Sequence, residues 1–359
     1  MPISPEALIR DDVRAMRAYQ VHDSSGCIKL DANENPHALP QHLRAALAER
    51  LAQVALHHYP DGGVSTVKQQ LRRHLQLADA YDILFGNGSD ECIQLLVQAI
   101  AADGVKVMAA EPTFVVYRMA AQASRVTFVG VERRADLTVD VERMLDAIAT
   151  HQPQLLFLTS PNNPSGDVIA EADLRRLIAA APGLVVLDEA YIAFAEAPML
   201  KLLDDYSNLL LMRTFSKIGA AGLRLGYLVG RREWLAELDK LRMPYNINSL
   251  TQTAASFLLE HFEVIEQQVA QIRRDRDQLI ADLAAFPALT VLPSQANMFV
   301  VRSEHAEALY HFLHERRILV RLTNWHPLLK HCIRISTGIP DENAALLAAV
   351  SDFFATRQA

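Results

Sequence analysis

The sequence is poor in the features that mark disulfide-bonded, secreted and membrane proteins. Its 359 residues include three cysteines, Cys27, Cys92 and Cys332. This odd and widely spaced set excludes a disulfide framework and a cysteine-based zinc site, and it fits a reducing cytosol. No apolar run approaches the length of a membrane span. The first residues contain no basic stretch followed by an apolar one, so we expect no signal peptide and a cytoplasmic protein.

An excess of positive charge is also missing. Lysine and arginine number 35 against 42 aspartates and glutamates, which gives a net charge of −7. No basic block stands out, so nucleic acid and anionic membranes are not expected partners. The closest sets among the 13 histidines are His57 with His58 and His311 with His314. Neither forms an HExxH motif, and no cysteine or carboxylate cluster completes them, so we expect no metal site.

What the chain does have is apolar sequence for a large core, because half of its residues are hydrophobic. Its length predicts about two domains of roughly 150 residues each. Short apolar runs without polar alternation are typical of strands covered by helices on both faces. Six such runs are residues 83–85, 105–109, 155–159, 184–187, 209–212 and 227–229. Helical patterns separate them, which predicts an α/β fold with a largely parallel sheet.

The pattern changes after about residue 250. Residues 251–285 predict one or two long helices, and further helices are expected at 306–316 and from about 341 onward. Strands are expected at 297–301, 318–322 and 332–336. We therefore predict a large domain over residues 30–250 and a smaller α/β domain made of residues 1–29 together with 251–359.

A lysine follows the apolar run at 209–212. Lys217 lies in the segment SKIGAAGLRLGY at residues 216–227, seven residues before Arg224. Taken alone, a lysine after a strand is usually a surface residue. In a shielded site, however, its amine becomes nucleophilic and can form a Schiff base with an aldehyde cofactor.

Two further polar segments follow buried runs. Residues 188–191 read DEAY, and residues 162–166 read NNPSG. Out of context, the run ending in Asp188 resembles the Walker B motif of a P-loop ATPase, but the chain has no GxxxxGK[ST] segment, which excludes that class. Asp188 could also simply cap the next segment. The NNPSG turn sits where α/β proteins bind ligands, at the carboxyl end of a strand.

A glycine-rich junction between a strand and a helix reads GNGSDE at residues 86–91. It lacks the third glycine of a dinucleotide fingerprint, because Glu91 takes that place. A single phosphate fits better, since glycines allow close backbone approach and the N–H groups at a helix N-terminus favour an anion. Asp90 and Glu91 add opposing charge, so they must point away or act as acids of the first helical turn.

Together these segments resemble fold-type I pyridoxal-phosphate aminotransferases. Matches near the N-terminus, at Tyr19 and in LDANENP at residues 30–36, and matches in the C-terminal part are similar to their histidinol-phosphate branch. The SKIGAAGLRLGY, NNPSG and DEAY segments carry the superfamily resemblance, which extends from Tyr19 to Gly338. The loop between Lys217 and Arg224 is one residue shorter than is usual in the family. The resemblance implies a seven-stranded, mainly parallel sheet between helices in the large domain. It also implies a homodimer with shared active sites.

The resemblance also implies roles for individual residues. Lys217, Asp188 and Tyr191 would be catalytic, with Lys217 bonded to the cofactor, Asp188 beside its pyridine nitrogen, and Tyr191 on its phenolate oxygen. The residues implied to bind pyridoxal phosphate are Tyr59 of the neighbouring subunit, Gly88, Ser89, Asp90, Phe114, Asn163, Asp188, Tyr191, Thr214, Ser216, Lys217 and Arg224. Those implied to bind substrate are Tyr19, Asn33, Asn163, Arg321 and Arg334.

Some of these residues also have ordinary structural interpretations. Phe114, in EPTF at residues 111–114, could equally pack in the core, although an aromatic ring there can stack on a cofactor. Arg334 lies between apolar neighbours in an expected strand and needs a partner, since an unpaired buried charge is costly. The resemblance makes it a clamp for the donor's carboxylate, and makes Arg321 a ligand of the substrate phosphate.

The function expected from the resemblance is amino-group exchange between histidinol phosphate and 2-oxoglutarate, with glutamate as the paired amino acid, in histidine biosynthesis. An aromatic or broad-range aminotransferase and a phosphothreonine decarboxylase on the same scaffold stay open, because all three need the same electron sink. A cofactor-carrying regulator would require a basic DNA-binding region, for which this acidic chain has no room.

Overall fold

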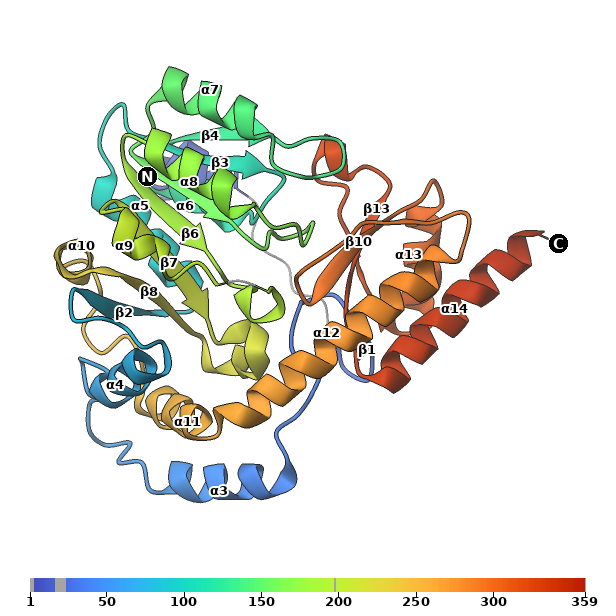
Figure 1. Cartoon of the computed structure of the whole chain (residues 1–359), viewed down its shortest axis with the longest axis horizontal. Helices are drawn as coiled ribbons and strands as arrows, with labels where there is room; N and C mark the ends of the chain where they lie inside the picture. The colour runs from blue at the N-terminus through green and yellow to red at the C-terminus, as the bar shows by residue number, and fades with distance from the viewer. Residues whose placement is uncertain (1–2, 17–23, 197, 359) are drawn as a thin grey trace.

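The chain forms two bodies, each built on its own β-sheet (Figure 1). The structure, a computed structural model, describes residues 3–16, 24–196 and 198–358. A seven-stranded sheet lies in the larger body and a four-stranded sheet in the smaller one, and the long helix α12 (Phe262–Ala284) runs between them. The predicted fold class, α/β with a large sheet between helices and a smaller α/β unit, is confirmed.

The large sheet is mainly parallel, as predicted. In spatial order its strands are β2 (Tyr81–Asn87), β8 (Leu225–Arg231), β7 (Leu209–Thr214), β6 (Leu184–Asp188), β5 (Leu155–Thr159), β3 (Lys106–Glu111) and β4 (Thr127–Glu132). Strands β3 to β7 pair in parallel, whereas β8 runs antiparallel to both of its neighbours. Six strands overlap the six predicted runs. The seventh, β4, lies at the sheet edge with its terminal residues exposed, so it has no continuous apolar run.

Helices cover both faces of this sheet, which explains why the central strands are apolar throughout. Every residue of β5, β6 and β7 is buried. Successive side chains alternate between two cores, so that Leu156 and Leu158 face one side and Leu155 and Phe157 the other. Helices α5 (Ser89–Ile100), α6 (Val116–Ala123) and α10 (Arg232–Asp239) cover the second face. The first is covered by α4 (Ser65–His74), α7 (Val141–His151), α8 (Glu171–Ala180), α11 (Ser249–Glu260) and the start of α12.

The smaller body packs helices against an antiparallel sheet. Its strands are, in order, β12 (Arg321–Leu322), β13 (Cys332–Ser336), β10 (Met298–Arg302) and β9 (Thr290–Val291). Phe299 and Phe353 are fully buried in its core, between the sheet and helices α13 (Ala306–Glu315) and α14 (Pro340–Gln358). The strand predicted at 318–322 divides in two, because β11 (Ile318–Leu319) pairs in parallel with β1 (Ile28–Lys29) before β12 joins the other sheet.

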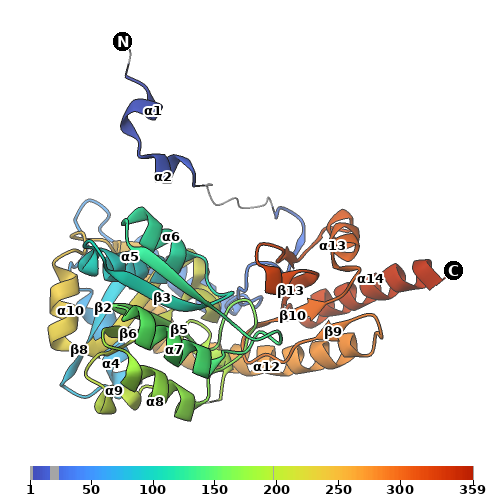
Figure 2. The same ribbon diagram turned by 90° about the horizontal axis from the view of Figure 1, so that it is seen from above.

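The N-terminal segment projects from the body in Figure 2. Arg10, between α1 (Pro5–Leu8) and α2 (Asp11–Arg14), donates to the carbonyl oxygens of Gln122 and Ala123 at the end of α6. The remaining elements are α3 (Gln41–Ala52), α9 (Leu202–Asp205), η1 (Ile192–Phe194), η2 (Ser216–Ala220), η3 (Ala221–Leu223) and η4 (Pro327–Leu329). Among the helices of the described ranges, none has the length and apolarity to cross a membrane.

Candidate active site

The predicted polar residues converge on one cavity of about 570 Å³ between the two sheets. The predicted residues that line it are Asn33, Ser89, Asp90, Phe114, Asn163, Asp188, Tyr191, Thr214, Ser216, Lys217, Arg224, Arg321 and Arg334. Strand order explains the convergence. Thr159 and Asp188 are register partners at the carboxyl ends of β5 and β6, and Thr214 ends the neighbouring strand β7. Parallel strands deliver their following loops to one edge of the sheet.

Lys217 lies half-buried in the irregular turn η2, directly after β7. Its Nζ is 3.4 Å from the carbonyl oxygen of Ala32 and 5.5 Å from the centroid of the Tyr191 ring. The short loop to Arg224 folds as η2 and η3, and Arg224 ends it in a left-handed conformation with φ of 50°. Both side chains still line the cavity, so the shorter loop does not separate them.

Asp188 is buried at the end of β6, with 3% of its surface exposed. Its Oδ2 accepts a hydrogen bond from the Tyr117 hydroxyl at 2.5 Å, and its Oδ1 accepts one from the backbone N–H of Ala190 at 2.9 Å. Burial raises the pKa of this carboxyl group to about 6, although both hydrogen bonds act to lower it. The next residue, Glu189, forms an ion pair with Arg213 at 2.7 Å, so the two adjacent carboxylates serve different sites.

Tyr191 is held by the segment that follows β1. Its hydroxyl oxygen accepts a hydrogen bond from Asn33 Nδ2 at 3.0 Å. Asn33, in turn, is fixed by Ser336, which accepts from the Asn33 backbone N–H at 2.9 Å and donates to Asn33 Oδ1 at 3.1 Å. The smaller body therefore positions a hydroxyl of the larger one. Because the Tyr191 oxygen already accepts, its own proton is available for a ligand.

The N-terminus of α5 forms a polar cup at the other end of the cavity. Gly88 precedes the helix with φ of 79°, and the helix has no side-chain cap. This positive φ is strained for any residue with a Cβ, and a Cβ here would also lie 2.6 Å from Arg224 Nη2, which would have to move. Ser216 Oγ accepts from Thr214 Oγ1 at 2.9 Å. Unfilled N–H groups, hydroxyls and a guanidinium together suit a phosphate.

The two acids of the GNGSDE segment both belong to the first turn of α5, as one of the two predicted arrangements requires. Glu91 turns back and accepts from the backbone N–H of Asn87 and from Asn246 Nδ2. Asp90 does not point away, because its carboxylate pairs with Arg224 at 3.0 Å. Both partners of that pair are nearly half exposed, so the ion pair is weak and a bound anion can compete for the guanidinium.

Two arginines face each other on the wall formed by the smaller sheet. Arg321 of β12 and Arg334 of β13 are register partners on antiparallel strands, which puts their side chains on the same face. Arg334 Nη1 donates to Asn163 Oδ1 at 2.7 Å, and Nη2 donates to the carbonyl oxygen of Asp31. Two guanidinium groups on one face of this wall suit a bound anion.

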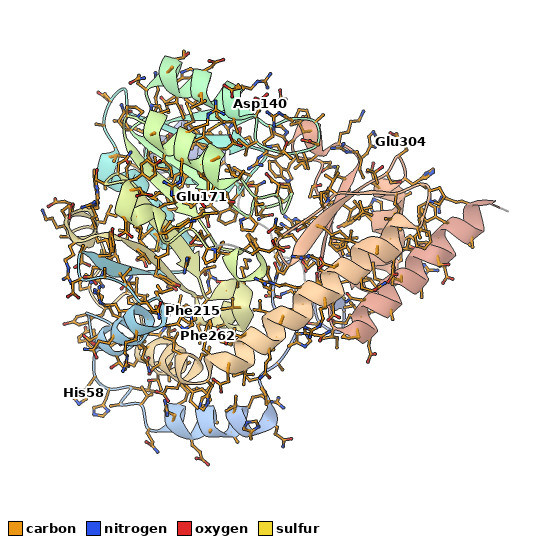
Figure 3. The ribbon with its side chains drawn as sticks, in the orientation of Figure 1. His58, Asp140, Glu171, Phe215, Phe262 and Glu304 are labelled. Atoms are coloured by element: carbon orange, nitrogen blue, oxygen red, sulfur yellow. The ribbon has the colours of Figure 1, made fainter. Side chains whose placement is uncertain are left out.

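Among the predicted residues that the structure describes, Gly88 does not itself line the cavity but precedes Ser89, which does, and Tyr59 lies elsewhere. Tyr59 is 81% exposed and stacks on Tyr245, with ring centroids 4.7 Å apart. Its loop lies at the outer edge of the molecule, next to His58 in Figure 3. This position accords with a role outside its own chain. Tyr19 lies outside the described residues.

Sequence reasoning missed the polar groups behind Asp188. Tyr117 is fully buried on α6, three residues after Phe114, and its ring stacks on Phe157 with centroids 4.3 Å apart. The residues that share a helix face with Tyr117 are apolar or aromatic, so the hydrophobic pattern of α6 predicts that Tyr117 is an ordinary core residue. Its hydroxyl could have been noticed only by pairing the α6 pattern with the end of β6, which requires the topology of the sheet.

Comparisons with known proteins agree with this geometry. The sequence pattern of the family described as "Aminotransferase class I and II" matches residues 25–350. Histidinol-phosphate aminotransferase 1 of Burkholderia lata is 48% identical over 349 residues, which cover 97% of this chain and 98% of that protein.

Two solved structures share the fold. The histidinol-phosphate aminotransferase of Sinorhizobium meliloti in complex with pyridoxal-5'-phosphate superposes with a TM-score of 0.87 at 25% identity, covering 96% of this chain and 97% of that one. The L-threonine-O-3-phosphate decarboxylase of Porphyromonas gingivalis superposes with a TM-score of 0.78 at 24% identity, covering 91% and 99%. At its level of identity, the decarboxylase likeness shows the fold alone.

The buried carboxylate makes stability depend on pH in a specific way. The pKa of Asp188 in the folded protein, about 6, lies above the ordinary aspartate value of 3.8. The folded protein therefore binds more protons between these values, and the free energy of unfolding falls as the pH rises through this window. In the ligand-free protein, Asp188→Asn should be more stable than the wild type at pH 7, by up to about 3 kcal/mol, and about equal to it near pH 4.

Urea unfolding of the two proteins at pH 4, 5, 6 and 7 measures this difference. Asp103→Asn, which changes an exposed carboxylate in a loop, is the matched control and should show no such trend. A wild type that gained stability relative to Asp188→Asn as the pH rose would show that Asp188 is stabilised in its charged form.

Proposed function

The chain belongs to the class I and II aminotransferase family, and on this basis we propose that it exchanges the amino group between histidinol phosphate and 2-oxoglutarate, with pyridoxal phosphate as cofactor. The observation that carries the choice of substrate is the facing pair Arg321 and Arg334 on the cavity wall. Guanidinium groups pair phosphates and carboxylates bidentately, so this wall suits a phosphorylated amine in one half-reaction and glutamate in the other.

The residues of the cavity fit pyridoxal phosphate on several grounds. The uncapped N-terminus of α5, with Ser216 and Arg224, suits the phosphate group. The Asp188 carboxylate lies at the cavity edge and is almost fully shielded from water. A protonated, cationic ring nitrogen of the cofactor would balance its negative charge. Phe114 lines the same cavity and offers a stacking face.

When bound, the cofactor supplies an aldehyde that captures an amine and a pyridine ring that accepts electrons from the substrate Cα. Lys217 would hold the cofactor and, once displaced by the substrate amine, move a proton between the substrate Cα and the cofactor C4′. Asp188 would keep a proton on the pyridine nitrogen.

Hydrogen-bond polarity supports the roles of two further residues. Tyr191 accepts from Asn33, and Asn163 accepts from Arg334 at its Oδ1. The Tyr191 hydroxyl proton and the Asn163 amide protons are therefore left to donate, as the phenolate oxygen of the cofactor requires. Each donor would stabilise the negative charge on that oxygen.

We also propose that the active protein is a cytoplasmic homodimer, with residues 30–250 as its large domain and residues 1–29 and 251–359 as its small one. The support for shared sites is the position of Tyr59, whose ring is 81% exposed, stacks on Tyr245 and does not line the cavity of its own chain. Most homodimers have twofold symmetry, so the Tyr59 residues of the two subunits would take equivalent positions at the two active sites.

Lys217→Ala tests the proposal at its centre. The variant should lose the borohydride-reducible link between protein and cofactor and should not complete multiple turnovers, because Lys217 is the residue proposed to supply the amine that bonds to the cofactor. Tyr59→Ala should be impaired in cofactor binding. When equal amounts of the two variants are unfolded together and reassembled, about half of the dimers should be mixed, and each mixed dimer contains one intact site of two. Activity should therefore return to roughly a quarter of the wild-type value.

A reducible link that persisted in Lys217→Ala would contradict the assignment of the lysine. Reassembly without any recovered activity, in a sample shown by sedimentation to contain dimers, would contradict shared sites. Full activity in a monomer would do the same.

Arginine variants test the substrate. Arg334→Ala should weaken glutamate binding strongly, and Arg321→Ala should weaken binding of histidinol phosphate, with a smaller effect on glutamate. Each loss of a desolvated charge-assisted contact should cost about 2–5 kcal/mol. Steady-state kinetics with each substrate measure the effects, and Arg274→Ala, on the exposed face of α12, is the matched control. Equal losses for histidinol phosphate and unphosphorylated histidinol in Arg321→Ala would exclude the phosphate contact.

A further inference from the structure

A chain of buried polar groups begins at Asp188. Its first members are Tyr117, which does not line the cavity, and Thr159, which does. The hydroxyl of Tyr117 lies 2.5 Å from Asp188 Oδ2 and 2.9 Å from Thr159 Oγ1. Tyr117 is fully buried and Thr159 is 4% exposed. The Tyr117 ring is held between α6 and the sheet by its stacking on Phe157, with an interplanar angle of 9°. Its hydroxyl therefore has little freedom to leave the carboxylate.

The proton of each hydroxyl in this chain has a definite direction. Thr113 Oγ1 lies 2.7 Å from Asn162 Oδ1 but 3.4 Å from Thr159 Oγ1, so its proton goes to the asparagine. The Thr159 proton is then left for the Tyr117 oxygen, and the Tyr117 proton for Asp188. An ionised carboxylate only accepts hydrogen bonds, so this direction suits Asp188 in its charged form.

The far end of the chain is anchored by a buried ion pair. Asn162 Nδ2 donates to Ser165 Oγ at 2.7 Å, and Ser165 donates to Asp167. Asp167 pairs with Arg133 at 2.9 Å, and the Arg133 side chain is 1% exposed. These contacts hold the geometry of the network, because rotation of Asn162, Ser165 or Asp167 would break a buried hydrogen bond or the ion pair. The network thus fixes the NNPSG turn and the Tyr117 hydroxyl together.

We propose that Tyr117 is a positioning residue that orients the Asp188 carboxylate toward the ring nitrogen of the cofactor and holds it in its charged form. This inference rests on the proposed function, in which Asp188 faces that nitrogen. Tyr117 does not touch the substrate or the reacting atoms. It acts on Asp188 through one hydrogen bond to Oδ2.

The charges around Asp188 explain why such a residue is needed. Burial, and the nearby carboxylates of Asp90 and Glu189, all disfavour a negative charge on Asp188 and raise its pKa. Tyr117 and the backbone N–H of Ala190 oppose them, each lowering the pKa by stabilising one carboxylate oxygen. Without the Tyr117 hydroxyl, one oxygen would be buried and unpaired. The carboxyl group would then keep its proton and could not stabilise a positive ring nitrogen.

Tyr117→Phe removes the hydroxyl and keeps the stacked ring. Its matched control is Tyr81→Phe, because Tyr81 is also buried and donates to a carboxylate, Asp204 Oδ1 at 2.6 Å, at the far end of β2. Three quantities are measured on the holoenzymes: the dissociation constant of the cofactor, the pH midpoint of its visible absorbance, and the single-turnover rate. The rate is measured with pyridoxal phosphate and with an analogue that has a CH group in place of the ring nitrogen.

Tyr117→Phe should weaken cofactor binding about tenfold, the loss expected for a hydrogen bond to a charged group. The absorbance midpoint should move to higher pH, because a less positive ring repels a proton on the lysine-bound nitrogen less strongly. The rate should fall with pyridoxal phosphate and match the wild type with the analogue, which has no nitrogen for Asp188 to serve. Tyr81→Phe should change none of the three. Thr159→Val should move the midpoint in the same direction by less, and it replaces Tyr117→Phe if that variant does not fold.

An unchanged midpoint in Tyr117→Phe, with a rate deficit that is equally large for the analogue, would overturn the inference and leave Tyr117 as a packing residue. A wild type that binds the cofactor but does not transaminate histidinol phosphate would instead refute the proposed substrate. That result would leave the Tyr117 comparison intact, because cofactor affinity and absorbance involve no substrate.

Discussion

The burial of the Asp188 carboxylate at the end of β6 is the constraint on which the rest of the site depends. A carboxylate with 3% of its surface exposed is costly unless charge or hydrogen bonds compensate it. On one side, Tyr117 and Ala190 supply hydrogen bonds. On the cavity side, a cationic ligand can supply the missing charge. The fold thus contains a destabilised group whose cost is relieved when the cofactor binds, which couples cofactor affinity to the protonation state of one residue.

The two bodies divide the work of the site. The large sheet delivers Asp188 and Lys217 from the ends of adjacent strands, so the groups proposed to act on the cofactor share one rigid edge. The small sheet provides Arg321 and Arg334, which face the same cavity from the other side. Asn33, between the two, links Ser336 of the small sheet to Tyr191 in the loop after β6. A change in how the bodies sit would therefore alter the substrate contacts together with the contacts that hold Tyr191 and Asn163.

Much of this arrangement could be predicted because the central strands are buried on both faces. Strands β5 and β6 have no polar residue before their last positions, and β7 has none before Arg213, so their approximate limits, and the polar residues just beyond them, are readable from the sequence. The edge strand β4 lacks that signal because one side of it is exposed. The split between β11 and β12 depends on pairing with β1, nearly 300 residues earlier, which no local pattern encodes. Tyr117 was missed for the same reason, since its partner lies on another element. The resemblance to a known family supplied the roles of Tyr59 and Arg321, which periodicity alone does not indicate.

The protein is proposed to transfer an amino group from a phosphorylated amine in one cavity, with Asp188 and Lys217 at the edge of the large sheet and two arginines on the small sheet. This proposal is tested most directly by half-reactions of the purified holoenzyme, read by cofactor absorbance, with histidinol phosphate, histidinol, phenylalanine, phosphothreonine and glutamate. We expect histidinol phosphate and glutamate to convert the cofactor to its amino form efficiently, histidinol and phenylalanine to do so far more slowly, and phosphothreonine to release no carbon dioxide. Conversion of histidinol or phenylalanine as efficient as that of histidinol phosphate would contradict the account and identify a broad-range aminotransferase instead.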